Sequence, residues 1–266
     1  MGNFLFGSPL ALAFAQRAIG RYTLGHPGWQ ADLRRGLAVA QGADSLSYVT
    51  VVSYVYTAGI PAGAVLPHDS ALREIEDALT IAEQSGDDLQ LGVAWLTLGL
   101  ALVHRDTDAD RDRGQELLAE VRDVFLRDGH FLCDIPMLDA YIAREAARRG
   151  DHDQAIPTMR AAVDRLAQSG QLLSWGIMTT GVLVETLLDR GTERDVAEAE
   201  TAIERLAAEP ADEGLVGREI WLKRLQALSA RARGDVGAYT HSRDHYRDMA
   251  RTLGLEGHIV WADALP

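Results

Sequence analysis

Residues 148–170, RRGDHDQAIPTMRAAVDRLAQSG, predict a helix end, a sharp break and the start of a second helix. Gly150 can adopt the positive φ that ends a helix, and the two arginines before it suit a helix C-terminus. Pro157 donates no backbone N–H, so we expect it in or just after the first turn of the second helix. That position favours Asp153 over Asp151 as the N-cap residue. The stretch is therefore predicted to be a helical hairpin.

Small or apolar residues recur at the matching point of other predicted second helices, at intervals of 40 to 44 residues. These marker residues are Gly36, Ala78, Leu118, Ala162, Ala202 and Tyr246. A second pattern agrees, because the Ser-Gly pairs at residues 85–86 and 169–170 lie 84 residues apart. A fixed period of this size is the signature of a stacked repeat protein, in which each helix pair buries its apolar face against its neighbours.

The repeated unit resembles a tetratricopeptide-like repeat. GDHDQAIPTMRAAVDRL contains a Gly-Asp break followed by Ala155 and Ala162, two small residues seven positions apart. The period, about 42, exceeds the ~34 of ordinary tetratricopeptide repeats and lies within the ~40–47 of other two-helix solenoids. We predict an all-α, right-handed α-solenoid of about six helix pairs, with a short C-terminal capping helix around HIVWADA.

We expect a single helical-repeat domain over residues 1–266, because no Pro/Gly/Ser-rich linker separates two halves. The loosest stretch, residues 59–70, is predicted to be a long loop within a repeat.

The chain has a net charge of −13, and the acidic excess is spread evenly over its two halves. Phosphate binding needs a basic face, so we expect no nucleic-acid partner. Cys133 is the only cysteine, which excludes an internal disulfide and favours a cytoplasmic location. The apolar N-terminal stretch has no preceding positive residue, so we expect a helix starting at Ser8-Pro9 and no signal peptide. No apolar run approaches the ~20 residues that span a bilayer, so no membrane partner is expected.

Two patterns of metal-binding residues are incomplete. DTDADRDRG, residues 106–114, has alternating acids but lacks the glycine and glutamate of a calcium loop, so we expect a solvated helix start. His241 and His245 have the spacing of two zinc ligands. Ser242 stands where the metalloprotease motif has glutamate, and no third ligand is evident. We therefore predict no metal site.

No catalytic motif is complete either. Cys133 with His130 lacks a recognisable oxyanion hole, and the apolar residues around Cys133 predict a small core residue. Lys223, the only lysine, follows leucine, so the Gly-Lys-Ser/Thr core of a phosphate loop is absent, and no GxSxG occurs. The chain is expected not to be an enzyme and to need no cofactor.

Four aromatic residues in predicted first helices are the candidate binding residues: Tyr54, Trp95, Trp175 and Trp221. First helices usually line the concave face of a helical solenoid, where aromatic side chains can anchor a peptide or ligand. The alternative is that these rings fill gaps between helices, because large aromatic side chains are mostly buried.

Four stretches together carry a more specific resemblance. They are NFLFGSPLALAFAQRAIGRYTLGHPGWQADLRRGLAVAQ, REIEDALTIAEQSGDDLQLGVAWLTLGLALVHRD, GVLVETLLDRGTERDVAEAETAIERLAAEPADEGLVGREIWLKRLQALSARARGD and LGLEGHIVWADALP. They resemble the C-terminal helical region of large mycobacterial regulators, which join this region to a class III adenylate cyclase-like domain and an ATPase domain. The resemblance spans nearly the whole chain, and its motifs are structural.

The resemblance implies a non-enzymatic sensor or scaffold. Its partner would be a protein or peptide, including the cyclase or ATPase domains of the same polypeptide, and a small ligand is possible. The cyclase metal-binding aspartates and the phosphate loop have no counterpart here, so nucleotide chemistry is not carried over. The alternative is a small-molecule receptor or an unrecognised enzyme that uses an aromatic-lined groove. A long, open groove favours the sensor or scaffold, and a deep pocket favours the receptor or enzyme.

Overall fold

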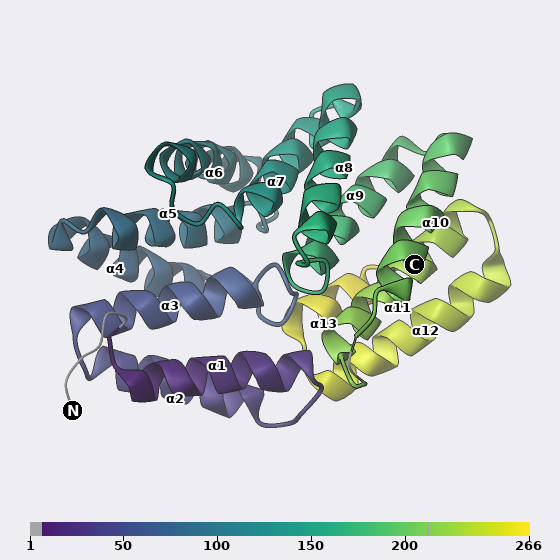
Figure 1. Cartoon of the computed structure of the whole chain (residues 1–266). Coiled ribbons are helices and arrows are strands. Elements are labelled where there is room, and N and C mark those ends of the chain that lie inside the picture. The colour runs from purple at the N-terminus through teal and green to yellow at the C-terminus, as the bar shows by residue number, and fades with distance from the viewer. Residues whose placement is uncertain (1–6, 212) are drawn as a thin grey trace. The chain divides into compact units, whose positions relative to one another are not determined.

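The computed structural model describes residues 7–211 and 213–266, which contain thirteen α-helices and no β-strand (Figure 1). The helices are α1 (Pro9–Thr23), α2 (Trp29–Gln41), α3 (Ser45–Gly59), α4 (Asp69–Ser85), α5 (Asp88–Leu102), α6 (Asp108–Asp128), α7 (Ile135–Arg148), α8 (His152–Gln168), α9 (Trp175–Arg190), α10 (Glu193–Ala208), α11 (Val216–Ala232), α12 (Val236–Leu253) and α13 (Glu256–Asp263). The prediction of an all-α chain is confirmed.

The marker residues of the repeat lie one in each even-numbered helix from α2 to α12. Five of the six are buried, and Ala202 is half-buried. The stretch around residues 59–70 forms the connection between α3 and α4, and HIVWADA lies mostly in the short helix α13. The alternation of helices in the structure is therefore compatible with the period seen in the sequence.

The helices form two compact units. Among the described residues, unit 1 contains 7–124 and 255–257, and unit 2 contains 125–211, 213–254 and 258–266. A division into two units does not distinguish one repeat array from two domains. In a repeat array each repeat contacts only its neighbours, so the two ends of the array also share few contacts. The single-domain expectation therefore stays a prediction.

In unit 1, each helix from α1 to α5 packs against the next, and α3 also packs against both α1 and α5 (Figure 1). Glycine allows α5 and α6 to approach closely. A Cβ added to Gly99 would lie 3.0 Å from Leu118 Cγ, and a Cβ added to Gly114 would lie 2.8 Å from the backbone nitrogen of Val103. Larger residues at either position would push the two helices apart.

In unit 2, each helix from α7 to α12 packs against the next, and α9 also packs against both α7 and α11. Trp221 of α11 is only 5% exposed and lies over Gly181 of α9. Its ring centroid lies 5.6 Å from that of Trp261 and 5.4 Å from that of His258. An aromatic cluster from α11 and α13 therefore forms part of the core of this unit.

Four tyrosines are buried: Tyr22 and Tyr56 in unit 1, and Tyr141 and Tyr246 in unit 2. The hydroxyl of Tyr246 forms a 2.9 Å hydrogen bond with Nδ1 of His258, which is also buried. Tyr141 packs its ring against the guanidinium of Arg144, 4.7 Å from the ring centroid.

The predicted N-cap residue is correct for α1 and incorrect for α8. Ser8 caps α1, accepting a hydrogen bond from the Ala11 N–H, and Pro9 is the first helical residue, as predicted. The prediction that Asp153 caps α8 is wrong, because Asp151 is the N-cap residue and accepts a hydrogen bond from the Gln154 N–H.

Pro157 lies inside α8, just after its first turn, as expected. The proline removes one helical hydrogen bond, to the carbonyl of Asp153, and the exposure of Asp153 lets water replace it. Gly150, with φ of 95°, reverses the chain directly before Asp151, which places that carboxylate at the helix start.

Candidate functional site

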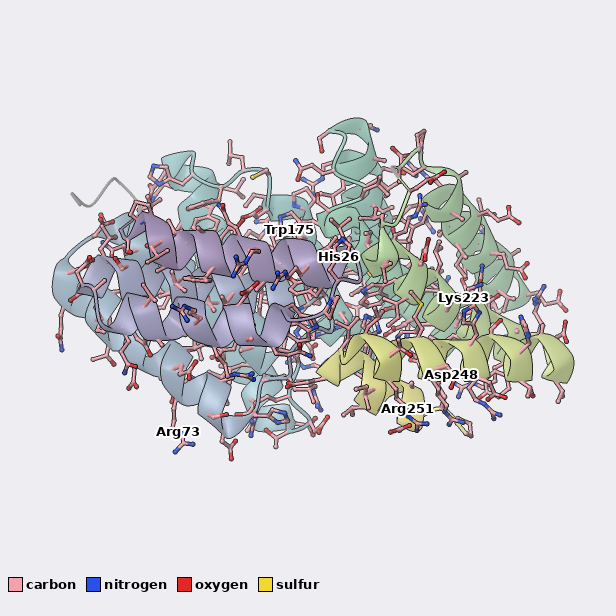
Figure 2. The ribbon with its side chains drawn as sticks, turned by 90° about the horizontal axis from the view of Figure 1, so that it is seen from below. His26, Arg73, Trp175, Lys223, Asp248 and Arg251 are labelled. Carbon is pink, nitrogen blue, oxygen red and sulfur yellow. The ribbon has the colours of Figure 1, made fainter. Side chains whose placement is uncertain are left out.

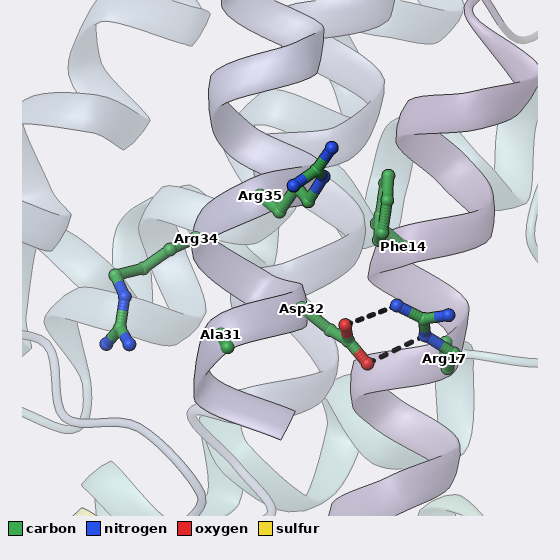
Figure 3. A pocket seen from close by; sticks show the side chains of 6 residues that line it. All are labelled: Phe14, Arg17, Ala31, Asp32, Arg34 and Arg35. Atoms are coloured by element: carbon green, nitrogen blue, oxygen red, sulfur yellow. Dashed lines mark hydrogen bonds and ion pairs between the residues drawn. The ribbon is translucent and has the colours of Figure 1, made fainter. Parts of the chain in front are cut away.

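An open hollow of about 690 Å³ lies on unit 1 over α1 and α2 (Figure 3). Its lining is dominated by arginine, and consists of Phe14, Arg17, Ala31, Asp32, Arg34 and Arg35. This composition differs from the acidic balance of the chain as a whole.

Asp32 is the only carboxylate of the hollow, and its side chain is 7% exposed. It accepts two hydrogen bonds from Arg17, at 2.8 Å from Nε and 2.6 Å from Nη2, and one at 2.7 Å from Nη1 of Arg21. The hydrogen bonds from Arg17, followed by the charges of both arginines, outweigh burial and lower the pKa of Asp32. One ionised carboxylate thus holds two guanidinium groups in fixed positions.

The turn before α2 makes room for this arrangement. Gly28 has φ of 87°, a conformation that L side chains rarely adopt, and a Cβ added there would lie 3.1 Å from Nη1 of Arg21. Glycine at this position therefore permits the turn and leaves the guanidinium of Arg21 free to reach Asp32.

Phe14 lies between two guanidinium groups. The Cζ atom of Arg17 lies 5.0 Å from the ring centroid and that of Arg35 lies 5.2 Å from it. Cation–π contacts at exposed sites contribute about 0.5–1 kcal/mol each. Arg34 projects from the other side of α2, and both Arg34 and Arg35 are exposed (Figure 3). The exposed surface formed by Phe14, Arg17, Arg34 and Arg35 is called the arginine face below.

Sequence reasoning missed the arginine face because it averaged charge over each half of the chain. The signal was present on a shorter scale: residues 7–43 contain four arginines and one aspartate. Net charge summed over a sequence window as long as one helix pair would have revealed the arginine face.

The two predicted aromatic residues of unit 1 lie on different helices, Tyr54 on α3 and Trp95 on α5. Tyr54 of α3 is 43% exposed and lies near Tyr22 of α1, whose pKa is raised by burial and, to a smaller extent, by Tyr54. Trp95 of α5 is half-buried and lies one turn before Gly99, on the side of α5 that faces α6. The structure therefore does not bring these two rings together.

The two predicted aromatic residues of unit 2 are more enclosed. Trp175 at the start of α9 is half-buried, and its Nε1 donates a 2.8 Å hydrogen bond to Asp134. Burial raises the pKa of this carboxyl. The position of Trp221 under Trp261 favours the alternative that its ring fills space between helices. Of the four aromatic residues, Tyr54 is the most exposed.

A second open hollow of about 520 Å³ lies over the ends of α2, α3 and α4, also in unit 1. Its lining is mainly polar and consists of Gln41, Asp44, Ser45, Tyr48, Asp77, Thr80 and Ile81. Neither this hollow nor the one over α1 and α2 is lined by any of the four predicted aromatic residues.

The predicted metal-binding patterns remain surface features. His241 and His245 are both exposed on α12, with their ring centroids 6.4 Å apart. Residues 7–211 and 213–266 contain no group of three or more His, Cys, Asp or Glu side chains that could hold a metal ion. The acidic stretch starting at Asp106 leads into α6, with Asp108 and Asp110 in its first turn, as predicted.

The prediction that Cys133 is a core residue is wrong, because its side chain is exposed. It lies in the connection between α6 and α7 and not on a buried helix face. Its Sγ lies 3.4 Å from a carboxylate oxygen of Asp134. Partial desolvation and the neighbouring negative charge raise the pKa of the thiol, which is the opposite of the shift that activates a nucleophile.

No protein-family model matches the chain, and neither a curated protein nor a solved structure was found to match it. Within the described part of the chain, no helix is both long enough and apolar enough to cross a membrane.

Proposed function

We propose that the chain is a non-enzymatic sensor or scaffold of a bacterial signalling regulator, which binds a protein partner on its helical surface in the cytoplasm. The proposal includes a right-handed solenoid of six helix pairs closed by α13. The partners proposed are the cyclase-like and ATPase domains of regulators of the type that the sequence resembles.

The observation that carries the proposal is the exposure of Tyr54. This ring lies on α3, which packs between α1 and α5 in unit 1, and 43% of it is accessible to solvent. Tyrosine is among the residues that most often dominate binding energy at protein interfaces, because it offers a large ring and a polar group at a small entropy cost. An extended helical surface with such a residue suits a polypeptide partner.

A small-molecule receptor or an enzyme has less support. Ligand pockets typically enclose most of the ligand and are lined mainly by apolar and aromatic side chains. The two hollows on unit 1 are open and are lined largely by charged and polar residues. The aromatic-lined pocket that this alternative requires has no counterpart in either hollow.

The proposal can be tested with purified cyclase-like and ATPase domains from such a regulator. Binding of each domain to this chain would be measured by calorimetry. Tyr54→Ala should weaken binding by about 2 kcal/mol, or roughly 30-fold, as loss of a central aromatic contact does.

Leu10→Ala is a matched control, because Leu10 is also an exposed apolar residue of unit 1 (58% exposed) and lies on α1. Its binding should equal that of the wild-type chain. Equal affinities of the wild-type and Tyr54→Ala chains for a domain that binds would contradict the proposed surface. Turnover of a nucleotide by the purified chain alone would contradict the non-enzymatic assignment.

A further inference from the structure

The helical hairpin α1–α2 has a charge opposite to that of the rest of the chain. Residues 1–43 carry four arginines and one aspartate, a net charge of +3, so the other 223 residues carry −16 of the total of −13. This separation of charge along the sequence concentrates positive potential on one helix pair.

The positive groups on this hairpin are only partly neutralised, because one carboxylate serves two of the four arginines. Asp32 is already engaged by Arg17 and Arg21. Arg35 contacts the Phe14 ring, and no carboxylate in the described part of the chain forms an ion pair with Arg34 or Arg35. The arginine face therefore presents at least two guanidinium groups whose hydrogen-bond donors are available to a partner.

Part of this face is held in position before any partner binds. The two hydrogen bonds between Arg17 and Asp32 fix one guanidinium, and Phe14 supports both that group and Arg35 (Figure 3). Guanidinium groups match carboxylates in planar, two-pronged pairs, and a group that is already positioned loses less entropy when it binds.

The shape and charge of the surroundings favour a polypeptide over other anions. The hollow is open, which suits an extended segment better than a small anion that needs enclosure. A nucleic acid is a long polyanion, and the −16 charge of the remaining residues would oppose its approach. A segment that crosses α2 would meet Arg35 on one side and Arg34 on the other (Figure 3).

We propose that the arginine face binds an acidic segment of a partner protein, with Glu or Asp carboxylates pairing with Arg34 and Arg35. This binding surface lies on α1 and α2 and does not include Tyr54 of α3. The proposal can therefore hold or fail independently of the interface at Tyr54, and the two are tested with different variants and different ligands.

The test uses a fluorescein-labelled peptide of about ten glutamates, with a glutamine peptide of equal length as the uncharged control, at low ionic strength where surface charges are little screened. Fluorescence anisotropy of the full chain should show binding of the glutamate peptide alone. Arg34→Glu/Arg35→Glu should weaken this binding by about tenfold or more, because two ion pairs are lost and two repulsions replace them.

Arg73→Glu/Arg194→Glu is the matched control, since it makes the same change in net charge at two exposed arginines on α4 and α10. Arg73 projects from α4 into solvent (Figure 2). We expect this control variant to bind within about twofold of the wild-type chain, because it changes the net charge equally but leaves Arg34 and Arg35 in place. Melting curves of both variants establish that each is folded.

Three outcomes would overturn the proposal. The first is failure of the wild-type chain to bind the glutamate peptide, and the second is equal weakening by the two charge-reversal pairs. The third is equally tight binding of a single-stranded oligothymidylate, with the same loss on Arg34→Glu/Arg35→Glu. That result would make the face a general polyanion surface and not a site for an acidic protein segment.

Discussion

Gly181→Ala should reveal how tightly α9 and α11 pack in unit 2. The added methyl group would lie 2.8 Å from Cε3 of Trp221 and closer still to Cζ3. The indole cannot move away easily, because Trp261 and His258 lie against it at centroid distances of 5.6 and 5.4 Å. Either α9 and α11 separate or the aromatic cluster rearranges.

The expected cost follows from two opposing effects. Overpacking a well-filled core costs about 1–3 kcal/mol, and this clash lies at the severe end because it involves a rigid ring. Replacing a glycine inside a helix by alanine otherwise stabilises it by about 0.8–1 kcal/mol. We therefore expect Gly181→Ala to destabilise unit 2 by about 2 kcal/mol, which lowers its Tm by about 4–8 °C.

A double-mutant cycle with Trp221→Ala isolates the contact, using urea unfolding followed by circular dichroism. Trp221→Ala alone should cost about 3–5 kcal/mol, because its buried ring leaves a cavity. In that background the clash is gone, so Gly181→Ala should become stabilising by about 1 kcal/mol. The two substitutions should thus be coupled by about 3 kcal/mol, well beyond the additivity expected of independent sites.

Gly20→Ala provides the control for helix propensity. Gly20 lies inside α1, and a Cβ added there meets no atom within 4 Å. This substitution should stabilise unit 1 by about 0.5–1 kcal/mol. If Gly181→Ala has the same effect with and without Trp221, the close packing of α9 against α11 does not exist in solution and the reasoning is refuted.

Three further outcomes are expected. Asp195→Asn should flatten the loss of stability in acid, because hydrogen bonds from Arg190 lower the pKa of this buried carboxyl; that stabilisation is present above pH about 4 and is lost as the pH falls towards the folded-state pKa. Urea unfolding across the acid range measures it, and parallel curves for both proteins would contradict it. Tyr54→Ala should lower the free energy of unfolding by less than about 1 kcal/mol, because Tyr54 is already 43% exposed; a larger loss would assign the ring to packing. The purified chain should contain no stoichiometric zinc by elemental analysis, and zinc that disappears with His241→Ala/His245→Ala would show that a ligand set had been missed.

The positions of helices were predictable because local signals mark their ends. Ser8-Pro9 begins α1 as its chemistry requires, and Gly150 ends the stretch after α7 with a positive φ. The repeat markers were also informative, because a small or apolar residue at a helix crossing is usually buried. These signals act over one or two turns of chain, which is the range that sequence reasoning handles well.

What the sequence could not provide depends on residues that meet only after folding. Arg17 and Asp32 are fifteen positions apart and belong to different helices. The sequence could not show that Tyr54 is exposed and Trp221 is buried either, since both occupy predicted first helices. Trp221 is buried because Gly181, forty positions earlier, leaves space for its ring. Only the packing of α9 on α11 makes that relationship visible.

The four buried tyrosines determine how the protein should respond to alkali. Burial raises the pKa of Tyr22, Tyr56, Tyr141 and Tyr246 well above the value of an exposed phenol. Folded stability from these groups is complete below pH about 10 and declines as the pH rises further, because the unfolded chain releases phenolic protons first. With 25 arginines and a single lysine, the cations keep their charge through this range. Alkaline unfolding should therefore coincide with the part of the ultraviolet tyrosinate signal that comes from the buried rings, since the ion pairs persist until these phenols reach solvent.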